Sequence, residues 1–196
     1  TTMVHEGGHA IHSFLCHSLE LNGFKEYPTE IAEVASMAME LFTMQHWDVY
    51  FADPIELSRA KEQQLERVIT IFPWIATIDK FQHWLYTHPG HTAKEREAMW
   101  MSILHEFSSP VVNFLGLEKY RAVLWQRQLH LFEVPFYYIE YGIAQLGAIG
   151  LWQQYKNDPD RTINNYLNAL SLGGTKTLPE LFAAADLTFD FSSATI

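Results

Sequence analysis

Apolar side chains recur at helical spacing along most of this chain, and short clusters of glycine, proline and asparagine separate the periodic stretches. No alternating apolar and polar stretch is long enough to indicate a β-strand. The pattern therefore predicts an all-α fold of many helices. The expected ranges are Thr1 to about Glu20, Pro28 to about Tyr50, Asp53 to about His88, Thr92 to about Phe107, Glu118 to about Phe132, Pro135 to about Asn157, Asp158 to about Leu172, and Leu178 to Ala185.

Residues at or inside the helix ends refine these ranges. Asp53 is suited to cap the third helix, and Thr92 with Glu95 has the spacing of a capping box. Pro73 falls inside the third helix and predicts a kink there, because proline has no backbone N–H to donate.

The composition fits a compact globular protein. Of 196 residues, 48% are hydrophobic and only 18% are charged, which leaves little sequence for disordered linkers. The length allows one or at most two domains, and we expect a single helical domain over residues 1–196. The net charge of -10 argues against a nucleic-acid partner, because phosphate binding needs a basic surface.

Cysteine usage and hydropathy indicate where the protein works. Cys16 is the only cysteine, so no disulfide forms within the chain, and we expect a cytoplasmic protein. No uninterrupted apolar run reaches the roughly 18 residues that a membrane span needs. We therefore expect no membrane partner.

The first helix carries an HExxH motif at His5, Glu6 and His9. Residues four apart lie on the same face of a helix, so both imidazoles can reach one Zn²⁺ at about 2.0–2.1 Å. Glu6 lies beside the metal, placed to take a proton from a zinc-bound water whose pKa the metal lowers to about 7. This pattern indicates hydrolysis of an amide bond.

Two glycines within the motif weigh against a helix that merely exposes two histidines to solvent. Gly7 and Gly8 lie in a predicted helix interior, where each costs about 1 kcal/mol relative to alanine. Close approach of a ligand or of a neighbouring backbone is the usual compensation.

A zinc peptidase needs a third protein ligand, which the sequence must supply from elsewhere. The extended metzincin pattern fails, because His12 and Leu15 stand where it requires glycine and histidine. Glu33 on the second helix is the candidate, since its neighbours are small and apolar and a buried carboxylate needs a partner or a metal. Glu30 fits a solvated face. His12 follows on the stripe of His5 and His9, where a supporting role remains open.

Aromatic residues later in the chain are a second candidate site. Tyr137 and Tyr141 are four residues apart, and Tyr138 and Tyr141 are three apart, so either pair can present hydroxyls to one spot. A phenol can stabilise a developing oxyanion, although an aromatic stripe that packs the core is an equally good reading. His130 lies among apolar residues, which by itself is more typical of a structural histidine.

Taken together, these motifs resemble the oligoendopeptidase F and thimet oligopeptidase family of zinc metallopeptidases, and the oligoendopeptidase F branch most. The segment His5–His12 resembles the family's active-site helix, and 33–36 with Glu40 resembles its second zinc-binding segment. The segments 126–130 and 135–142 resemble its third signature. All appear in family order and at family-like separations.

The resemblance implies a role for each residue of the metal site. His5, His9 and Glu33 would bind one Zn²⁺ per chain, and Glu6 would be the general base. Glu40 would accept a hydrogen bond from a ligand histidine and fix its tautomer. The implied activity is that of a metalloendopeptidase that hydrolyses internal bonds of short oligopeptides.

The resemblance also implies that His130 and the tyrosines contact the substrate and stabilise the oxyanion. We favour Tyr141 and then Tyr137 as the donor. The thimet branch has a further tyrosine at the position of Ala144, so the choice between Tyr138 and Tyr141 stays open.

The position of His5 so near the first residue predicts that this chain is the C-terminal catalytic portion of a longer, two-lobed helical peptidase. Its partners would then be an oligopeptide substrate and the N-terminal remainder of the parent peptidase. A non-catalytic zinc-binding helical module or an inactive fragment is the alternative. The intact Glu6 favours catalysis, since a structural zinc site needs no base.

Overall fold

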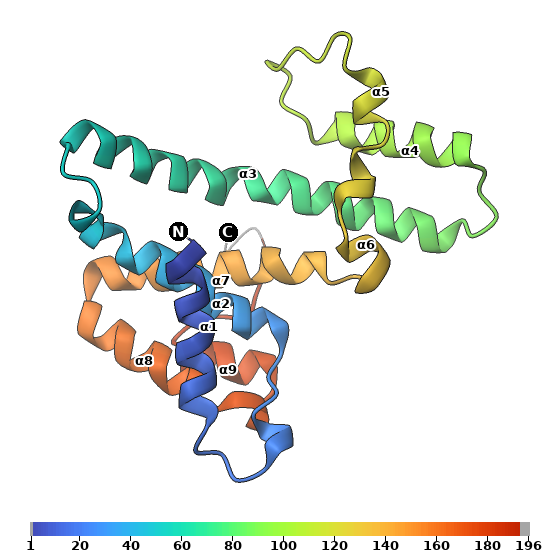
Figure 1. Cartoon of the computed structure of the whole chain (residues 1–196). Helices are drawn as coiled ribbons and strands as arrows, with labels where there is room; N and C mark the ends of the chain where they lie inside the picture. The colour runs from blue at the N-terminus through green and yellow to red at the C-terminus, as the bar shows by residue number, and fades with distance from the viewer. Residues whose placement is uncertain (1, 193–196) are drawn as a thin grey trace. The chain divides into compact units, whose positions relative to one another are not determined.

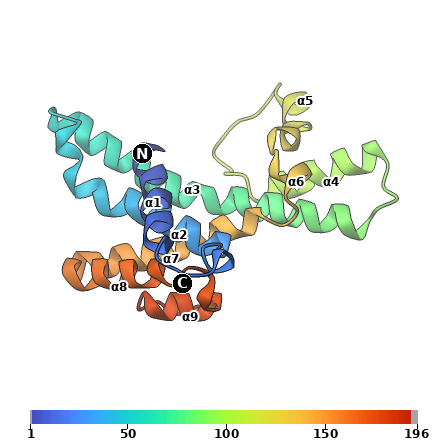
Figure 2. The same ribbon diagram turned by 60° about the horizontal axis from the view of Figure 1, so that its bottom comes forward.

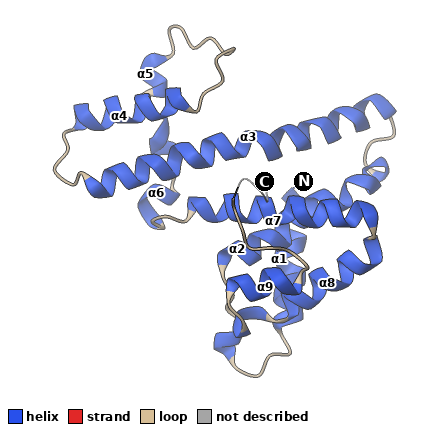
Figure 3. Cartoon of the chain, turned by 180° about the vertical axis from the view of Figure 1, so that it is seen from behind, coloured by secondary structure: helices blue, strands red, loops and turns tan. Residues whose placement is uncertain are grey.

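Most residues are helical in the part of the protein that its computed structural model describes, residues 2–192. Within that range every regular element is an α-helix or a 3-10 helix, as Figure 3 shows, and the predicted all-α fold is confirmed. None of the helices between these residues is both long enough and apolar enough to cross a membrane.

The chain divides into two compact units, which are described separately. The first unit comprises Thr1–Gln64 and Ile143–Ile196, and the second comprises Leu65–Gly142. The boundaries fall inside helix α3 (Pro54–Thr87) and inside helix α7 (Tyr138–Asn157). The expectation of one domain over residues 1–196 stays a prediction.

The first unit is a layered group of helices in which α1 packs across α2, as Figures 1 and 2 both show. Helix α8 contacts α1, α2 and α9. The elements that lie wholly in this unit are α1 (Thr2–Cys16), η1 (Asn22–Phe24), α2 (Thr29–Phe42), η2 (Thr43–Val49), α8 (Pro159–Ser171), η4 (Gly173–Thr175) and α9 (Leu178–Ala184).

The contact between α1 and α2 depends on Gly8. A Cβ atom built on Gly8 would lie 2.5 Å from the carbonyl oxygen of Ala35 and 2.6 Å from the Cα atom of Ser36. The buried Tyr166 hydroxyl of α8 donates to the same Ala35 carbonyl over 2.8 Å. Glycine is therefore what allows the two backbones to lie this close.

The second unit packs around aromatic side chains of α3 and α4 (Ala93–Glu106). Phe81 and Trp100 are fully buried, and their rings meet edge to face with centroids 5.0 Å apart. The Trp100 indole N–H donates over 2.7 Å to the carbonyl of Arg121, the last residue of α5 (Glu118–Arg121), and so ties α4 to α5. The remaining elements of this unit are η3 (Leu124–Arg127), α6 (His130–Glu133) and the first turn of α7.

The prediction of one continuous helix from Glu118 to Phe132 is wrong. The structure divides this range into three short elements, and Gln128 adopts an extended backbone between two of them. The Gln128 side chain bonds to Trp74 and to His130, so specific contacts replace the regular helix at this point.

Other helix ends also differ from the sequence-based ranges. Helix α7 begins at Tyr138 instead of Pro135, because Phe136 has φ +61°, which a right-handed helix excludes. Helix α1 ends at Cys16 instead of Glu20, where turn bonds of the i to i+3 type close it. The range from Pro28 to Tyr50 changes from α to 3-10 geometry at Thr43, whose hydroxyl donates to the Met39 carbonyl over 2.8 Å.

Candidate functional site

Three potential metal ligands converge in the first unit. Helix α1 places His5 and His9 on one face with ring centroids 5.0 Å apart, and α2 brings Glu33 opposite them. The Oε2 atom of Glu33 lies 3.5 Å from Nε2 of His5 and 3.7 Å from Nε2 of His9. One ligand atom from each residue lies within 4.8 Å of the other two, a spacing that a single cation can bridge.

The chemistry of these groups fits a zinc ion. Glu33 is only 6% exposed, and besides the imidazoles its Oε2 atom accepts a hydrogen bond from the Ser36 hydroxyl over 2.9 Å. A buried carboxylate with two imidazole rings beside it gathers potential ligand atoms, and a cation offsets the cost of burying the carboxylate. Two nitrogen donors and one oxygen donor are a ligand set typical of catalytic zinc sites.

A chain of hydrogen bonds behind His5 sets its orientation. Its Nδ1 atom donates to Oε1 of Glu40 over 2.7 Å, because an ionised carboxylate only accepts. Nε2 of His5 is thereby left as the atom that faces Glu33. The other oxygen of Glu40 accepts from the Gln64 amide over 2.6 Å, and Gln64 is itself buried. The Glu40 hydrogen bond is the main reason that the pKa of His5 is raised, against the opposing effect of burial.

Glu6 lies next to this cluster and outside it. Its side chain is exposed and follows His5 directly on α1, and its charge adds a smaller upward contribution to the pKa of His5. An exposed carboxylate beside the three converging ligands can exchange protons with solvent. This is the placement that a general base requires, and the role itself stays a prediction.

His12 does not join the three ligands. Its ring is 1% exposed and stacks on Tyr27 with centroids 3.5 Å apart and planes 15° apart. Burial lowers the pKa of His12 to about 4, so the ring is neutral and part of the core. Among the described residues, His12 forms no hydrogen bond with His5, His9 or Glu33. The sequence left a supporting role open for His12, and no such bond supports it.

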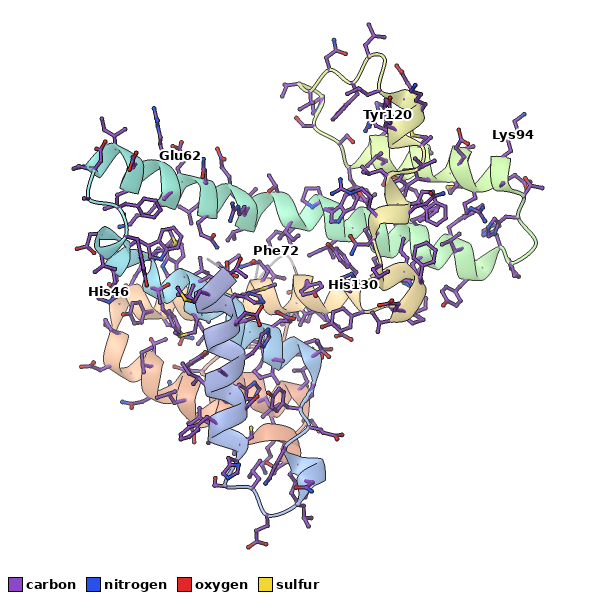
Figure 4. The ribbon with its side chains drawn as sticks, viewed as in Figure 1. His46, Glu62, Phe72, Lys94, Tyr120 and His130 are labelled. Carbon is purple, nitrogen blue, oxygen red and sulfur yellow. The ribbon has the colours of Figure 1, made fainter. Side chains whose placement is uncertain are left out.

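The second unit brings His130 together with all three tyrosines that the sequence singled out. The His130 ring lies 5.3 Å from that of Tyr137, 5.2 Å from that of Tyr138 and 5.7 Å from that of Tyr141, measured between centroids. The Tyr141 hydroxyl lies 3.3 Å from Nε2 of His130. Figure 4 labels His130, which opens the short α6 before the chain turns into α7.

The three tyrosines differ in burial and position. Tyr138 is 9% exposed and belongs to the hydrophobic core of the second unit, and burial raises the pKa of its phenol. Tyr141 lies one turn further along α7, with its ring 5.3 Å from that of Tyr138. Tyr137 directly precedes the helix, and its ring lies 5.3 Å from that of Tyr141 between centroids, so these two residues meet as their spacing of four predicted.

Comparison with known proteins places the whole chain in one group. The model of peptidase family M3 matches residues 1–196. The chain belongs to peptidase family M3. The resemblance to oligoendopeptidase F is confirmed by relatives in both sequence and structure.

Named relatives of this M3 chain include an oligoendopeptidase F homologue from Borreliella burgdorferi, with 24% identity over 89% of the chain and 30% of the relative. The solved structure of PZ peptidase A with an inhibitor superposes with a TM-score of 0.88 and 28% identity, over 98% of the chain and 34% of that protein. A structure from Bacillus anthracis assigned as oligoendopeptidase F has a TM-score of 0.80 and 25% identity, over 98% of the chain and 31% of that protein. The M3 chain thus spans about a third of the length of these relatives.

Sequence reasoning missed two residues of the metal site of this M3 chain. Ser36 was read only as part of a motif, although its hydroxyl holds the Glu33 carboxylate. Gln64 lies in a polar stretch of α3 and was not singled out, although it is 3% exposed and bonds to Glu40. For Gln64 no sequence signal existed, because its burial depends on where α3 passes α2.

Proposed function

We propose that this M3 chain carries the zinc centre of a metalloendopeptidase that hydrolyses internal bonds of short oligopeptides. The observation that supports this most is the convergence of His5, His9 and Glu33 with an exposed Glu6 beside them. Membership of family M3 supports the peptidase class. The single cysteine still favours a cytoplasmic location.

In this proposal His5, His9 and Glu33 hold the metal, which when bound supplies Lewis-acid polarisation and lowers the pKa of water. Glu40 keeps the proton of His5 on Nδ1, so that Nε2 stays available as a donor atom. Ser36 holds the Glu33 carboxylate in place. Glu6 accepts the proton of the attacking water and passes it to the leaving amine, which restores the carboxylate for the next turnover.

We further propose that Tyr141, and after it Tyr137, donates a hydrogen bond to the substrate carbonyl as negative charge develops on its oxygen. A neutral phenol suits this role because it does not compete with the metal ligands for charge. The burial of Tyr138 within the core of its unit favours a packing role for that residue. His130 lies against all three rings and would orient the donor.

A Glu6→Gln substitution tests the assignment of the base. Hydrolysis of a quenched fluorescent peptide is measured with a polypeptide of the relatives' full length that contains this chain. We expect kcat to fall by about 10²–10⁴-fold with unchanged metal content, because the amide cannot accept the proton. Glu20→Gln, at an exposed site just after α1, removes the same charge and should retain activity. Unchanged cleavage in Glu6→Gln would exclude Glu6 as the base.

A further inference from the structure

In the second unit a row of hydrogen bonds leads from the hydrophobic core to Tyr141. The Trp74 indole Nε1 lies 3.3 Å from Oε1 of Gln128, and Nε2 of Gln128 lies 2.6 Å from Nδ1 of His130. Nε2 of His130 lies 3.3 Å from the Tyr141 hydroxyl. Trp74, Gln128, His130 and Tyr141 are all partly buried.

The indole of Trp74 determines which way the Gln128 amide points. An indole N–H can only donate, and this one faces Oε1 of Gln128 as well as the hydroxyl of Tyr138. An NH₂ group in place of Oε1 would meet the indole N–H donor against donor, whichever acceptor that N–H favours. With Oε1 turned toward Trp74, the NH₂ group of Gln128 must point toward His130.

The Gln128 amide in turn determines which nitrogen of His130 carries the proton. Because Nε2 of Gln128 donates, Nδ1 of His130 must accept, and the proton of the neutral ring is then on Nε2. Nε2–H points at the Tyr141 oxygen, which accepts it. A phenol that accepts from His130 directs its own hydrogen away from the imidazole.

The other tautomer of His130, with the proton on Nδ1, creates a conflict at Trp74. If Nδ1 of His130 carried the proton, the Gln128 amide would have to turn Oε1 toward the imidazole. Its NH₂ group would then face the Trp74 N–H, donor against donor. Trp74 thus favours one tautomer of a histidine that it does not bond to.

We propose that Trp74 and Gln128 are positioning residues that hold His130 in the Nε2–H tautomer, so that the Tyr141 hydroxyl accepts from His130 and its own hydrogen is directed away from the imidazole. The tautomer follows from the hydrogen-bond pattern of the second unit. The benefit, a phenol that donates to a substrate carbonyl, rests on the proposed function.

Nitrogen-15 NMR of the histidine rings of the chain tests this directly, because protonated and unprotonated ring nitrogens have well separated chemical shifts. The spectra are recorded at mildly alkaline pH, and a His130→Gln spectrum assigns the resonances. We expect His130 to show an unprotonated Nδ1 and a protonated Nε2. A protonated Nδ1 in the unmodified chain would overturn the proposal.

Gln128→Glu is the decisive variant, since a carboxylate accepts and cannot donate. We expect Nδ1 of His130 to gain a proton in it, whether or not Nε2 keeps its own. Gln126→Glu is the matched control, because Gln126 is exposed on the same short helix η3 and the variant carries the same added charge. It should leave the tautomer unchanged. An unchanged tautomer in Gln128→Glu would contradict the proposal.

Trp74→Phe tests the first step of the chain of bonds. Phenylalanine keeps an aromatic ring against Trp100 but removes the N–H, so the Gln128 amide loses its fixed orientation. We expect both His130 tautomers to be populated. A single Nε2–H tautomer in a folded Trp74→Phe chain would exclude Trp74 from the role, and Gln128→Glu remains decisive if Trp74→Phe does not fold.

These spectra require neither bound metal nor hydrolysis. The tautomer can therefore be as proposed in a chain without peptidase activity, and an active peptidase can show the other tautomer. Failure of this inference and failure of the proposed function are thus separate results.

Discussion

Glu33 and Glu40 lie seven residues apart on α2, and their carboxylates have different partners. Glu33 faces the Nε2 atoms of His5 and His9, whereas Glu40 reaches Nδ1 on the far side of the His5 ring. The sequence predicted both residues but could not show what holds Glu40. That partner is Gln64, whose Nε2 lies 2.6 Å from Oε2 of Glu40.

Gln64→Met should weaken zinc binding without a matching loss of stability. The substitution removes the donor that orients Glu40, and loss of such an outer partner lowers metal affinity by about 10-fold or more. It also removes Oε1 of Gln64, a buried acceptor without a hydrogen bond among the described residues, whose removal offsets part of the loss. Zinc affinity is measured by competition with a chromophoric chelator, and stability by urea denaturation.

Gln63→Met serves as the control for this effect, because Gln63 is the exposed neighbour on the same helix. Its zinc affinity should equal that of the unmodified chain. Equal affinities in the two variants would show that Gln64 does not act on the metal site.

His12 should make the metal-free chain less stable in acid. Its folded pKa of about 4 lies below the ordinary value of 6.5, so the unfolded chain binds more protons between these values. The stability due to a neutral His12 is complete above about pH 6.5 and declines toward pH 4, by roughly 3 kcal/mol in all. Urea denaturation in the presence of a chelator should show a flatter acid limb for His12→Leu. Parallel pH profiles would contradict this.

At the scale of the helices, Gly7 and Gly8 form a natural pair of tests for the contact between α1 and α2. Gly8→Ala should cost about 1–3 kcal/mol of folding free energy, because its Cβ would meet the backbone of α2. The same substitution should shift α1, which carries His5 and His9, and so lower the affinity of the chain for zinc. A Cβ atom at Gly7 would have no atom from outside its own helix within 4 Å, so Gly7→Ala should stabilise the helix by about 1 kcal/mol. Thermal and urea unfolding measure the change in stability of each variant. Equal changes for Gly8→Ala and Gly7→Ala would show that α1 and α2 do not pack in this way.

Local signals predicted those helix boundaries that depend on nearby residues alone. Thr92 and Glu95 form the predicted capping box, and the Asp53 carboxylate accepts from the backbone of Ile55 near the start of α3. The range from Glu118 to Phe132 was predicted wrongly because its breaks come from distant partners. The Trp100 indole N–H donates to the Arg121 carbonyl, and the Trp74 indole N–H donates to the Gln128 side chain. Such contacts leave no periodic signal in the sequence.

At the scale of the whole chain, spacing predicted the metal cluster better than the aromatic one. His5, His9 and Glu33 depend on one helical turn and on one contact between helices, and the structure brings them together. The tyrosines also meet, with Tyr137 and Tyr141 in ring contact, but His130 reaches them through the irregular turn at Phe136, which no periodic pattern predicts. The two clusters belong to different units of the chain, and the chain spans about a third of its relatives' length.

The most direct test of the metal site is the zinc content of the purified chain beside that of Glu33→Ala, after dialysis against limiting free metal. We expect a single zinc ion per unmodified chain and nearly none in Glu33→Ala, because two imidazoles alone do not retain the ion. Glu30→Ala, in the first turn of the same helix, should keep full zinc content. Full zinc content in Glu33→Ala would contradict the site proposed for this M3 chain.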